Sequence, residues 1–113
     1  MDEAIVNFKD YVVSDALSRV PGVTAKPMFG GYGLYRDGLI FGIILSSHEL
    51  YFKVGDSNRA DYEQAGSRQF SYQHTHTNKP TKMAYWLVPD EVLEDKETIA
   101  IWVKKALAVH GEK

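Results

Sequence analysis

Three short stretches of the sequence contain residue types that could carry chemistry. Gly31 and Gly33 lie in a glycine-rich segment similar to loops that hold phosphate groups, and Ser46–Glu49 reads Ser-Ser-His-Glu. His74 and His76 are separated by one residue in a polar segment, so they would lie on one side of an extended chain. These stretches would support, in turn, nucleotide binding, nucleophilic catalysis and metal ligation.

The first two interpretations do not meet the requirements of their chemistry. The nucleotide fingerprint GxGxxG needs a third glycine and a following helix, whereas here the third glycine is missing and a strand is expected. Glycines in strands commonly mark a bend or a close approach of backbone, which is the interpretation that we favour. The serine and histidine of Ser46–Glu49 are neighbours in a tight turn without a GxSxG elbow, so no catalytic triad is expected.

A metal site is disfavoured as well. His48 could join His74 and His76 as a third nitrogen ligand, but no carboxylate lies at a recognised spacing. The chain also has no cysteine, which removes thiolate ligands, cysteine nucleophiles and disulfides. An acidic cluster near the C-terminus is typical of helix beginnings and solvated faces; it consists of Asp90, Glu91, Glu94, Asp95 and Glu97. We therefore expect no catalytic residue, no metal site and no cofactor.

The glycine-rich segment begins a predicted β-hairpin from Met28 to Leu45. Asp37-Gly38 is typical of a type I′ turn, in which both central residues have positive φ. A plain two-residue turn would place Leu34 opposite Phe41, Tyr32 opposite Ile43, and Gly33 opposite Gly42. In the simplest register of the next strand, Leu50 to Val54, Phe52 lies beside Ile43 and Lys53 beside Gly42. These pairings predict a core face with Leu34, Phe41, Ile43, Leu45, Leu50 and Phe52.

The opposite face of this predicted hairpin contains the only candidate binding site. Lys53 would lie over a trough formed by Gly33 and Gly42, with Tyr35 and Tyr51 beside it. Such a cation next to bare backbone could hold a small anion or a partner peptide. The alternative is a solvated lysine on an exposed sheet face, since lysine is rarely buried without a partner.

The remaining sequence predicts helices and strands that complete an α+β fold. Apolar residues recur at helical spacing near both ends of the chain, and alternation over short segments predicts strands. We expect a twisted antiparallel sheet of about five strands with N-terminal, middle and C-terminal helices. The helices are predicted from Asp2 to about Arg19, after Asp56–Asn58 up to Gly66, over Asp90–Leu93, and from Asp95, as its N-cap, onward. The further strands are predicted at Val23–Met28, Phe70–Tyr72 and Lys82–Val88, with Gln73–Thr81 as a polar loop.

Composition limits the classes of protein that the chain can belong to. Its 113 residues, 44% hydrophobic and 25% charged, suit one globular domain over residues 1–113. A formal net charge of −2 makes direct nucleic-acid binding unlikely, because phosphate contacts need clustered Lys and Arg. The acidic N-terminus is unlike a signal peptide, and no stretch reaches the roughly 18 apolar residues of a membrane span. We expect a cytoplasmic protein without a membrane segment.

Motif residues occur along nearly the whole chain, from the glycine-rich hairpin to Trp102 near the C-terminus. They are Met28, Phe29, Gly30, Gly31, Gly33, Leu34, Tyr35, Gly38, Phe41, Leu50, Tyr51, Phe52, Lys53, Ala65, Gly66, Phe70, Ser71, Tyr72, Met83, Ala84, Tyr85, Val88, Pro89, Val92, Leu93 and Trp102. In their order and spacing these motifs resemble the N-terminal domain of the TfoX/Sxy family, bacterial proteins associated with the regulation of natural competence.

The resemblance implies a secretion-chaperone-like α+β domain that acts without catalysis. It implies a regulatory or adaptor role through protein contacts in transcription regulation, and it assigns no catalytic residue. The longer regulators carry a C-terminal helical domain, so we expect a stand-alone N-terminal domain here. Apolar residues on both predicted sheet faces further suggest a homodimer, and three helices covering both faces is the monomeric alternative. A small-ligand or anion-binding module on the Gly33, Gly42 and Lys53 face is the alternative function, and direct DNA binding is a less favoured one.

Overall fold

A computed structural model describes residues 3–28, 30–73 and 80–112, and of residues 71–73 and 80–83 it describes the backbone. The helices are α1 (Glu3–Tyr11), α2 (Arg59–Gln64), α3 (Asp90–Leu93) and α4 (Lys96–Ala108), with a π-helical turn η1 (Val12–Ala16) and a 3-10 turn η2 (Val109–Gly111). The strands are β1 (Val23–Met28), β2 (Gly31–Arg36), β3 (Leu39–Ser46), β4 (Glu49–Lys53), β5 (Gln69–Gln73) and β6 (Pro80–Leu87).

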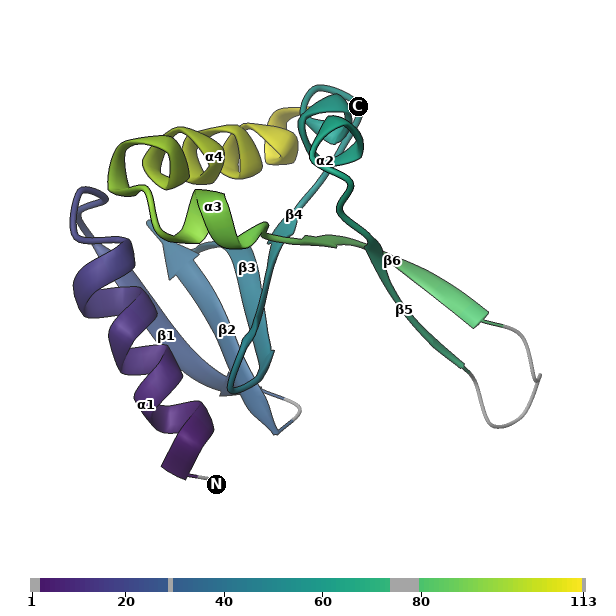
Figure 1. Cartoon of the computed structure of the whole chain (residues 1–113). Helices are drawn as coiled ribbons and strands as arrows, with labels where there is room; N and C mark the ends of the chain where they lie inside the picture. The colour runs from purple at the N-terminus through teal and green to yellow at the C-terminus, as the bar shows by residue number, and fades with distance from the viewer. Residues whose placement is uncertain (1–2, 29, 74–79, 113) are drawn as a thin grey trace.

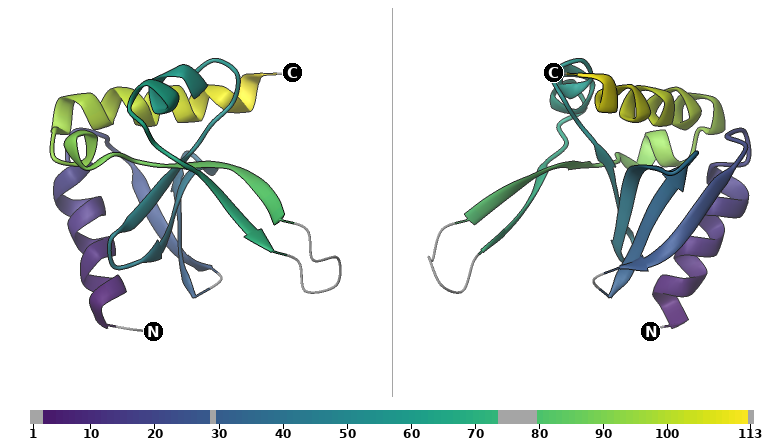
Figure 2. Two further views of the ribbon diagram at one scale, coloured as in Figure 1. Left: turned by 45° about the vertical axis from the view of Figure 1, so that its right-hand side comes forward. Right: turned by 180° about the vertical axis from the view of Figure 1, so that it is seen from behind.

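The strands form one antiparallel sheet in the order β1-β2-β3-β4-β6-β5. Helices α1, α3 and α4 lie on one side of β1–β4, and the hairpin of β5 and β6 extends away from the body as an arm (Figures 1 and 2). The predicted α+β class is therefore confirmed, with six strands instead of about five. No helix in the described part of the chain is long and apolar enough to cross a bilayer.

The N-terminal helix is shorter than the predicted Asp2–Arg19 segment and ends in a π-helical turn. The backbone N–H of Leu17 donates to the Val12 carbonyl at 2.8 Å, a bond to the fifth residue back instead of the fourth. This wider turn puts Val12, Ala16 and Leu17 into the core together, with at most 2% of each exposed. A regular helix would have turned Leu17 away from Val12, so tertiary packing explains the difference.

The C-terminal helices follow the prediction closely. The Asp95 carboxylate caps α4 by accepting from the backbone N–H groups of Glu97 at 3.1 Å and Thr98 at 3.2 Å. These bonds, first the one from Thr98, lower the pKa of Asp95. One face of α4 then enters the core through Ile99 and Val103, which are 0% and 1% exposed.

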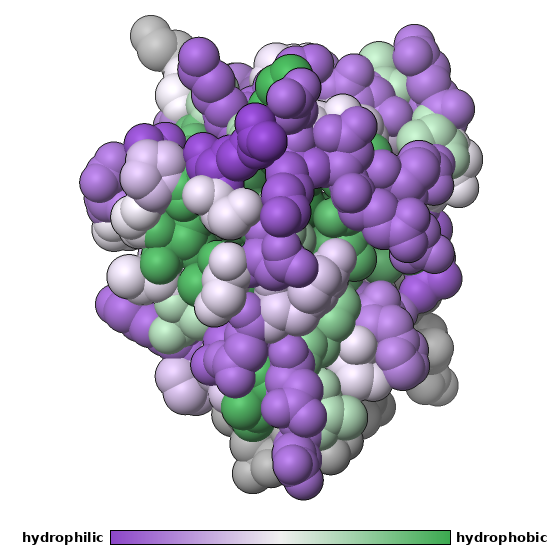
Figure 3. Space-filling view, turned by 60° about the vertical axis from the view of Figure 1, so that its left-hand side comes forward, coloured by the Kyte–Doolittle hydropathy of each residue, from purple (hydrophilic) through white to green (hydrophobic). Residues whose placement is uncertain are grey.

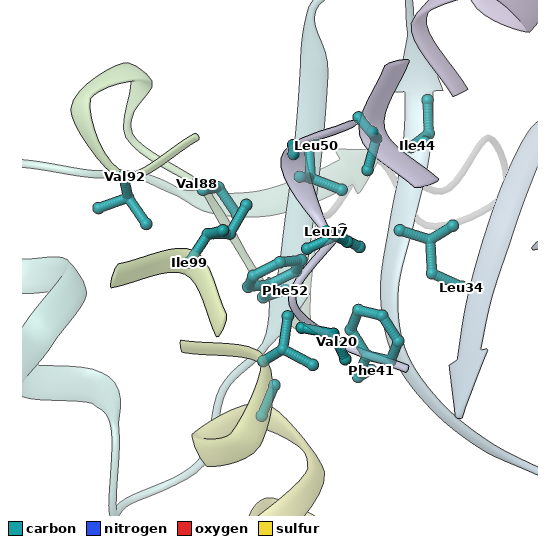
Figure 4. Packing of buried hydrophobic residues seen from close by; sticks show 14 of the residues in the cluster. Leu17, Val20, Leu34, Phe41, Ile44, Leu50, Phe52, Val88, Val92 and Ile99 are labelled. Carbon is teal, nitrogen blue, oxygen red and sulfur yellow. The ribbon is translucent and has the colours of Figure 1, made fainter. Parts of the chain in front are cut away.

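The core lies between the helices and one face of the sheet (Figure 4). Phe41 and Phe52 meet edge to face with ring centroids 5.6 Å apart, and both are fully buried. Figure 4 shows Leu17 and Val20 from the N-terminal segment and Ile99 from α4 converging on these rings. This contact joins segments distant in the sequence around the central hairpin.

A second aromatic cluster attaches α2 to the body. The Tyr62 ring lies 4.5 Å from Trp102 of α4 and 6.2 Å from Trp86 of β6, measured between centroids. Tyr62 is 1% exposed, and its buried hydroxyl has no hydrogen-bond partner in the described part of the chain. Burial raises the pKa of this phenol far above its usual range, so it stays protonated. Gly66, with φ of +72°, ends the α2 segment as predicted.

The hairpin turn is as predicted, but the strand register beyond it is not. Asp37 and Gly38 have φ values of 53° and 78°, the positive angles of a type I′ turn. The predicted pairs of Leu34 with Phe41, Tyr32 with Ile43, and Gly33 with Gly42 are wrong. The structure instead pairs Leu34 with Gly42, Tyr32 with Ile44, and Gly33 with Ile43.

A β-bulge at Phe41 causes this shift. The register changes between Leu34 and Tyr35, so that Phe41 becomes an extra residue on β3. Ile44 consequently joins the core cluster, and the predicted core residue Ile43 faces the other way. The next strand shifts too: Gly42 pairs with Phe52 and Ile43 with Tyr51, which corrects the predicted pairs of Ile43 with Phe52 and Gly42 with Lys53.

Candidate functional site

The sheet surface opposite the core carries no helix over β1–β4, as the view from behind shows (Figure 2, right). We call this surface the helix-free face. Neighbouring strands contribute to it through the cross-strand pairs Tyr35 with Ile40, Gly33 with Ile43, Ile43 with Tyr51, and Lys53 with Tyr85. Phe70 of β5 extends it, with its ring 5.2 Å from the Tyr51 ring. The face thus combines aromatic, aliphatic and lysine side chains.

Four of the five predicted site residues lie on the helix-free face, and the fifth does not. Gly33, Tyr35, Tyr51 and Lys53 share this face, whereas Gly42 faces the core. A Cβ atom on Gly42 would lie 2.9 Å from the Phe52 ring, so the missing side chain makes room for a core aromatic. The predicted trough of two adjacent glycines is therefore not formed, and binding by the remaining four stays a prediction.

The space beside Gly33 is filled by Tyr35. A Cβ atom on Gly33 would be 3.0 Å from the Tyr35 ring and 3.4 Å from the Ile40 side chain. The Lys26 ammonium nitrogen in turn lies 5.1 Å from the centroid of the Tyr35 ring. Glycine here allows a tyrosine to lie flat on the sheet, and a lysine covers that tyrosine through a cation–π contact.

Lys53 packs against an aromatic ring of the neighbouring strand. Its ammonium nitrogen lies 5.5 Å from the Tyr85 centroid, and it makes no ion pair with any residue that the structure describes. Burial raises the pKa of Tyr85, and the nearby Tyr35 raises it further. Two tyrosines therefore lie near each other on the helix-free face, each covered by a lysine.

Tyr51 is fixed by a carboxylate at the edge of the same face. Its hydroxyl donates to Glu49 at 2.8 Å, and the same carboxylate accepts from Arg68 at 2.5 Å. Ser46 donates to the other oxygen of Glu49 at 3.1 Å. The bonds from Tyr51 and then Ser46, with the charge of Arg68, lower the pKa of Glu49, while burial and then Glu49 raise the pKa of Tyr51.

These contacts give Ser46–Glu49 a structural role. The carboxylate of Glu49 is occupied by Tyr51, Arg68 and Ser46, whereas His48 contacts the Ser47 hydroxyl at 3.0 Å. The four residues thus close the tight turn between β3 and β4 and support the helix-free face.

The histidine hypothesis lies outside the described residues, because it depends on His74 and His76. Within residues 3–28, 30–73 and 80–112, no group of three or more His, Asp and Glu side chains is arranged to hold a metal ion.

Several motif glycines have structural roles in or near the central hairpin. Gly30 and Gly38 adopt φ of +79° and +78°, and a Cβ atom at Gly31 would overlap the Ile44 carbonyl oxygen. Pro89 directly precedes α3, and Phe29 lies outside the described residues. Met28 pairs with Gly31 at the start of the hairpin, and Tyr85 lies on the helix-free face.

Sequence reasoning missed the contribution of Lys26 and the position of Tyr85 beside Tyr35. The sequence did contain a signal for Lys26. Neighbouring residues of a strand point to opposite faces, and Ala25, the neighbour of Lys26, packs against the core. The approach of Tyr85 to Tyr35 had no local signal, since it depends on the order β4-β6 and on the twist of the sheet.

The fold and this face define a small α+β domain whose antiparallel sheet is covered by helices on one face only. A family model described as the TfoX N-terminal domain matches residues 15–110 of the chain. The chain therefore belongs to the TfoX N-terminal domain family, as the sequence motifs predicted. A search among curated proteins gave no match.

Proposed function

We propose that this protein is a non-enzymatic regulatory or adaptor domain that acts through protein contacts in transcription regulation, as a homodimer. The observation that carries this proposal is the helix-free face, with half-buried Tyr35, Ile40, Phe70 and Tyr85 and no helix over it. A sheet with apolar side chains on both faces gains stability when both are covered. A second copy of the chain would supply that cover.

The arm formed by β5 and β6 supports a second copy as the partner. Among the described residues, β6 pairs with β4 at Tyr51 with Leu87, Phe52 with Trp86, and Lys53 with Tyr85. Beyond this short stretch, β5 and β6 extend away from the body (Figure 1). A two-stranded ribbon is marginally stable alone in water. In a twofold dimer each arm would lie against the helix-free face of the other copy, which buries both features at once.

Sedimentation velocity over a concentration series tests the dimer. We expect a dimer at micromolar concentration, and Tyr85→Glu should produce a monomer because it places a charge in the apolar interface. The matched control is Ile101→Glu, which alters a side chain 55% exposed on the outside of α4. Circular dichroism must show that both variants keep their fold. A wild-type monomer at high micromolar concentration contradicts the dimer.

The regulatory part of the proposal is tested by partner capture. The wild-type protein and a Lys53→Glu variant are used as paired baits in cytoplasmic extract, since Lys53 lies on the helix-free face and makes no ion pair with a carboxylate in the described chain. We expect a component of the transcription machinery to bind the wild type and to be reduced by the variant. A DNA shift assay on the purified protein should give no salt-sensitive complex, because the net charge is −2. A salt-sensitive shift would favour direct DNA binding instead.

The second candidate function is anion binding at Gly33, Tyr35, Tyr51 and Lys53. The free charge of Lys53 is the observation that favours it, and the contact of its ammonium group with the Tyr85 ring weakens it. Amide shifts at Gly33 and Lys53 during a titration with an acidic peptide would support this function, and unchanged shifts there would remove it.

A further inference from the structure

A cleft on the helix-covered side of the molecule has a composition different from that of the helix-free face. Its volume is about 420 Å³, and it lies where the turn before β1, the end of β2 and one face of α4 meet. Val20 and Val103, 8% and 1% exposed, form its apolar wall together with Ala100. Figure 3 looks at the molecule from the side of α1, where hydrophilic side chains cover most of the surface and hydrophobic residues are visible between them.

Three cationic side chains line this cleft. They are Arg19 from the turn before β1, Arg36 from the end of β2, and Lys104 from α4. Arg19 contacts Glu97 at 3.3 Å, and both side chains of that pair are mostly exposed. The side chains of Arg36 and Lys104 make no ion pair or hydrogen bond with any residue in the described part of the chain. Like charges gathered around one cleft repel each other, and a bound anion would remove that repulsion.

We propose that this cleft binds a small organic phosphate. The phosphate group lies between Arg36 and Lys104, where the arginine fork offers two parallel N–H donors and the lysine a third cationic contact. The carbon skeleton of the ligand packs on Val20, Ala100 and Val103. The volume is within the range of small-molecule sites, roughly 300–1,000 Å³. None of the described residues that line the cleft is aromatic, so a nucleobase would have no ring among them on which to stack.

This site is independent of the proposed dimer. Arg19, Arg36 and Lys104 lie on the helix-covered side, whereas the proposed dimer contact uses the opposite face of the sheet. Failure of one proposal therefore leaves the other standing, because their variants affect different residues and their measurements differ.

A titration followed by amide NMR shifts tests the site with glycerol 3-phosphate, inorganic phosphate and adenosine monophosphate as probes. We expect saturable shifts at Val20, Arg36 and Lys104 with all three probes. Glycerol 3-phosphate should bind more tightly than inorganic phosphate, because only the ester contacts the apolar wall. Equal affinities for glycerol 3-phosphate and inorganic phosphate would show that the carbon skeleton makes no contact with the apolar wall. The absence of saturable shifts at millimolar concentration would show that the cleft does not bind phosphate. If adenosine monophosphate bound most tightly of the three probes, the inference that the cleft has no place for a nucleobase would be overturned.

Two variants and one matched control locate the binding. Arg36→Gln and Lys104→Gln should each weaken glycerol 3-phosphate binding by about tenfold, the change expected for one charge-assisted hydrogen bond. Neither residue has an ion-pair partner in the described chain, so both variants should fold. Lys105→Gln removes the same charge one residue along α4, where Lys105 pairs with Asp61 at 2.9 Å, and should leave binding unchanged. Equal weakening by all three would indicate nonspecific charge attraction and would overturn the site.

Discussion

The side chains on the two faces of the sheet are shielded from water in different ways. On the helix-covered face, Phe41 and Phe52 are fully buried under side chains contributed by helices. On the helix-free face, Ile43 and Tyr51 are 4% and 3% exposed although no helix covers them. Side chains of the strands themselves give part of that cover, since the Phe70 ring lies 5.2 Å from the Tyr51 ring. Tyr35 and Tyr85 on the same face stay half-buried, each with a lysine over its ring. One face is thus a packed core. The other face has buried Ile43 and Tyr51 next to the sheet and lysine ammonium groups over its outer tyrosine rings.

Deletion of a core ring should give the largest effect and tests the first half of this comparison. Phe52→Ala removes a fully buried ring that contacts Phe41, so it should lower the free energy of unfolding by about 3–5 kcal/mol. Urea denaturation followed by circular dichroism measures the change. A loss below about 1 kcal/mol would mean that the helices do not seal this face as the structure indicates.

The two glycines on opposite faces should respond differently to the same substitution. Gly42→Ala places a methyl group 2.9 Å from the Tyr51 carbonyl oxygen and the Phe52 ring, so overpacking should cost about 2 kcal/mol. Gly33→Ala meets first the Tyr35 ring, a side chain that can move outward, and should cost less than about 1 kcal/mol. Thermal and urea unfolding of both variants provide the measurement. The reverse order would contradict the assignment of these glycines to the two faces.

A smaller effect is expected from the polar rim of the helix-free face. Tyr51→Phe keeps the ring on Phe70 and removes only the hydroxyl that donates to Glu49, so the loss should be about 1 kcal/mol. Urea denaturation measures it, and Glu49→Ala, which removes the acceptor, combined with Tyr51→Phe gives the coupling energy in a double-mutant cycle. Additive single effects would show that the hydrogen bond contributes nothing.

The smallest expected effect is the contribution of Glu49 to the pH dependence of stability. The folded pKa of Glu49 is lowered, chiefly by the Tyr51 hydrogen bond, so this group contributes stability above the unfolded pKa of about 4.3. That contribution should disappear as the pH falls through the lower folded pKa. Glu49→Gln should therefore flatten the acid limb of the stability profile measured by urea denaturation. Glu63→Gln, on the exposed surface of α2, is the control; an identical acid limb in wild type and Glu49→Gln would contradict the prediction.

Local signals predicted most of the fold. The Asp37-Gly38 turn, the Asp95 cap and the end of the α2 segment at Gly66 each depend on a few neighbouring residues, and all three are confirmed. The family follows from motifs that do not require the register to be known. These features could be read from the sequence because their causes lie within a few positions of one another.

The register and the candidate sites required the tertiary structure. The bulge at Phe41 arises where that ring packs on Phe52, which is on another strand, so a hairpin considered alone gives the simpler pairing. The bulge turns Gly42 toward the core and Ile43 away from it, and the predicted trough is lost. Likewise, Arg36 and Lys104 come together only because α4 crosses the end of β2, and no sequence pattern marks that meeting.

The aromatic cluster around Tyr62 of α2 gives the protein an intrinsic fluorescence signal that comes from one region. Trp86 and Trp102 are the two tryptophans of the chain, and both rings lie within 6.2 Å of the Tyr62 ring. Intrinsic fluorescence therefore reports on one place, the junction of α2, β6 and α4. A partner that moved the β5 and β6 arm would change the emission through Trp86, without any attached dye.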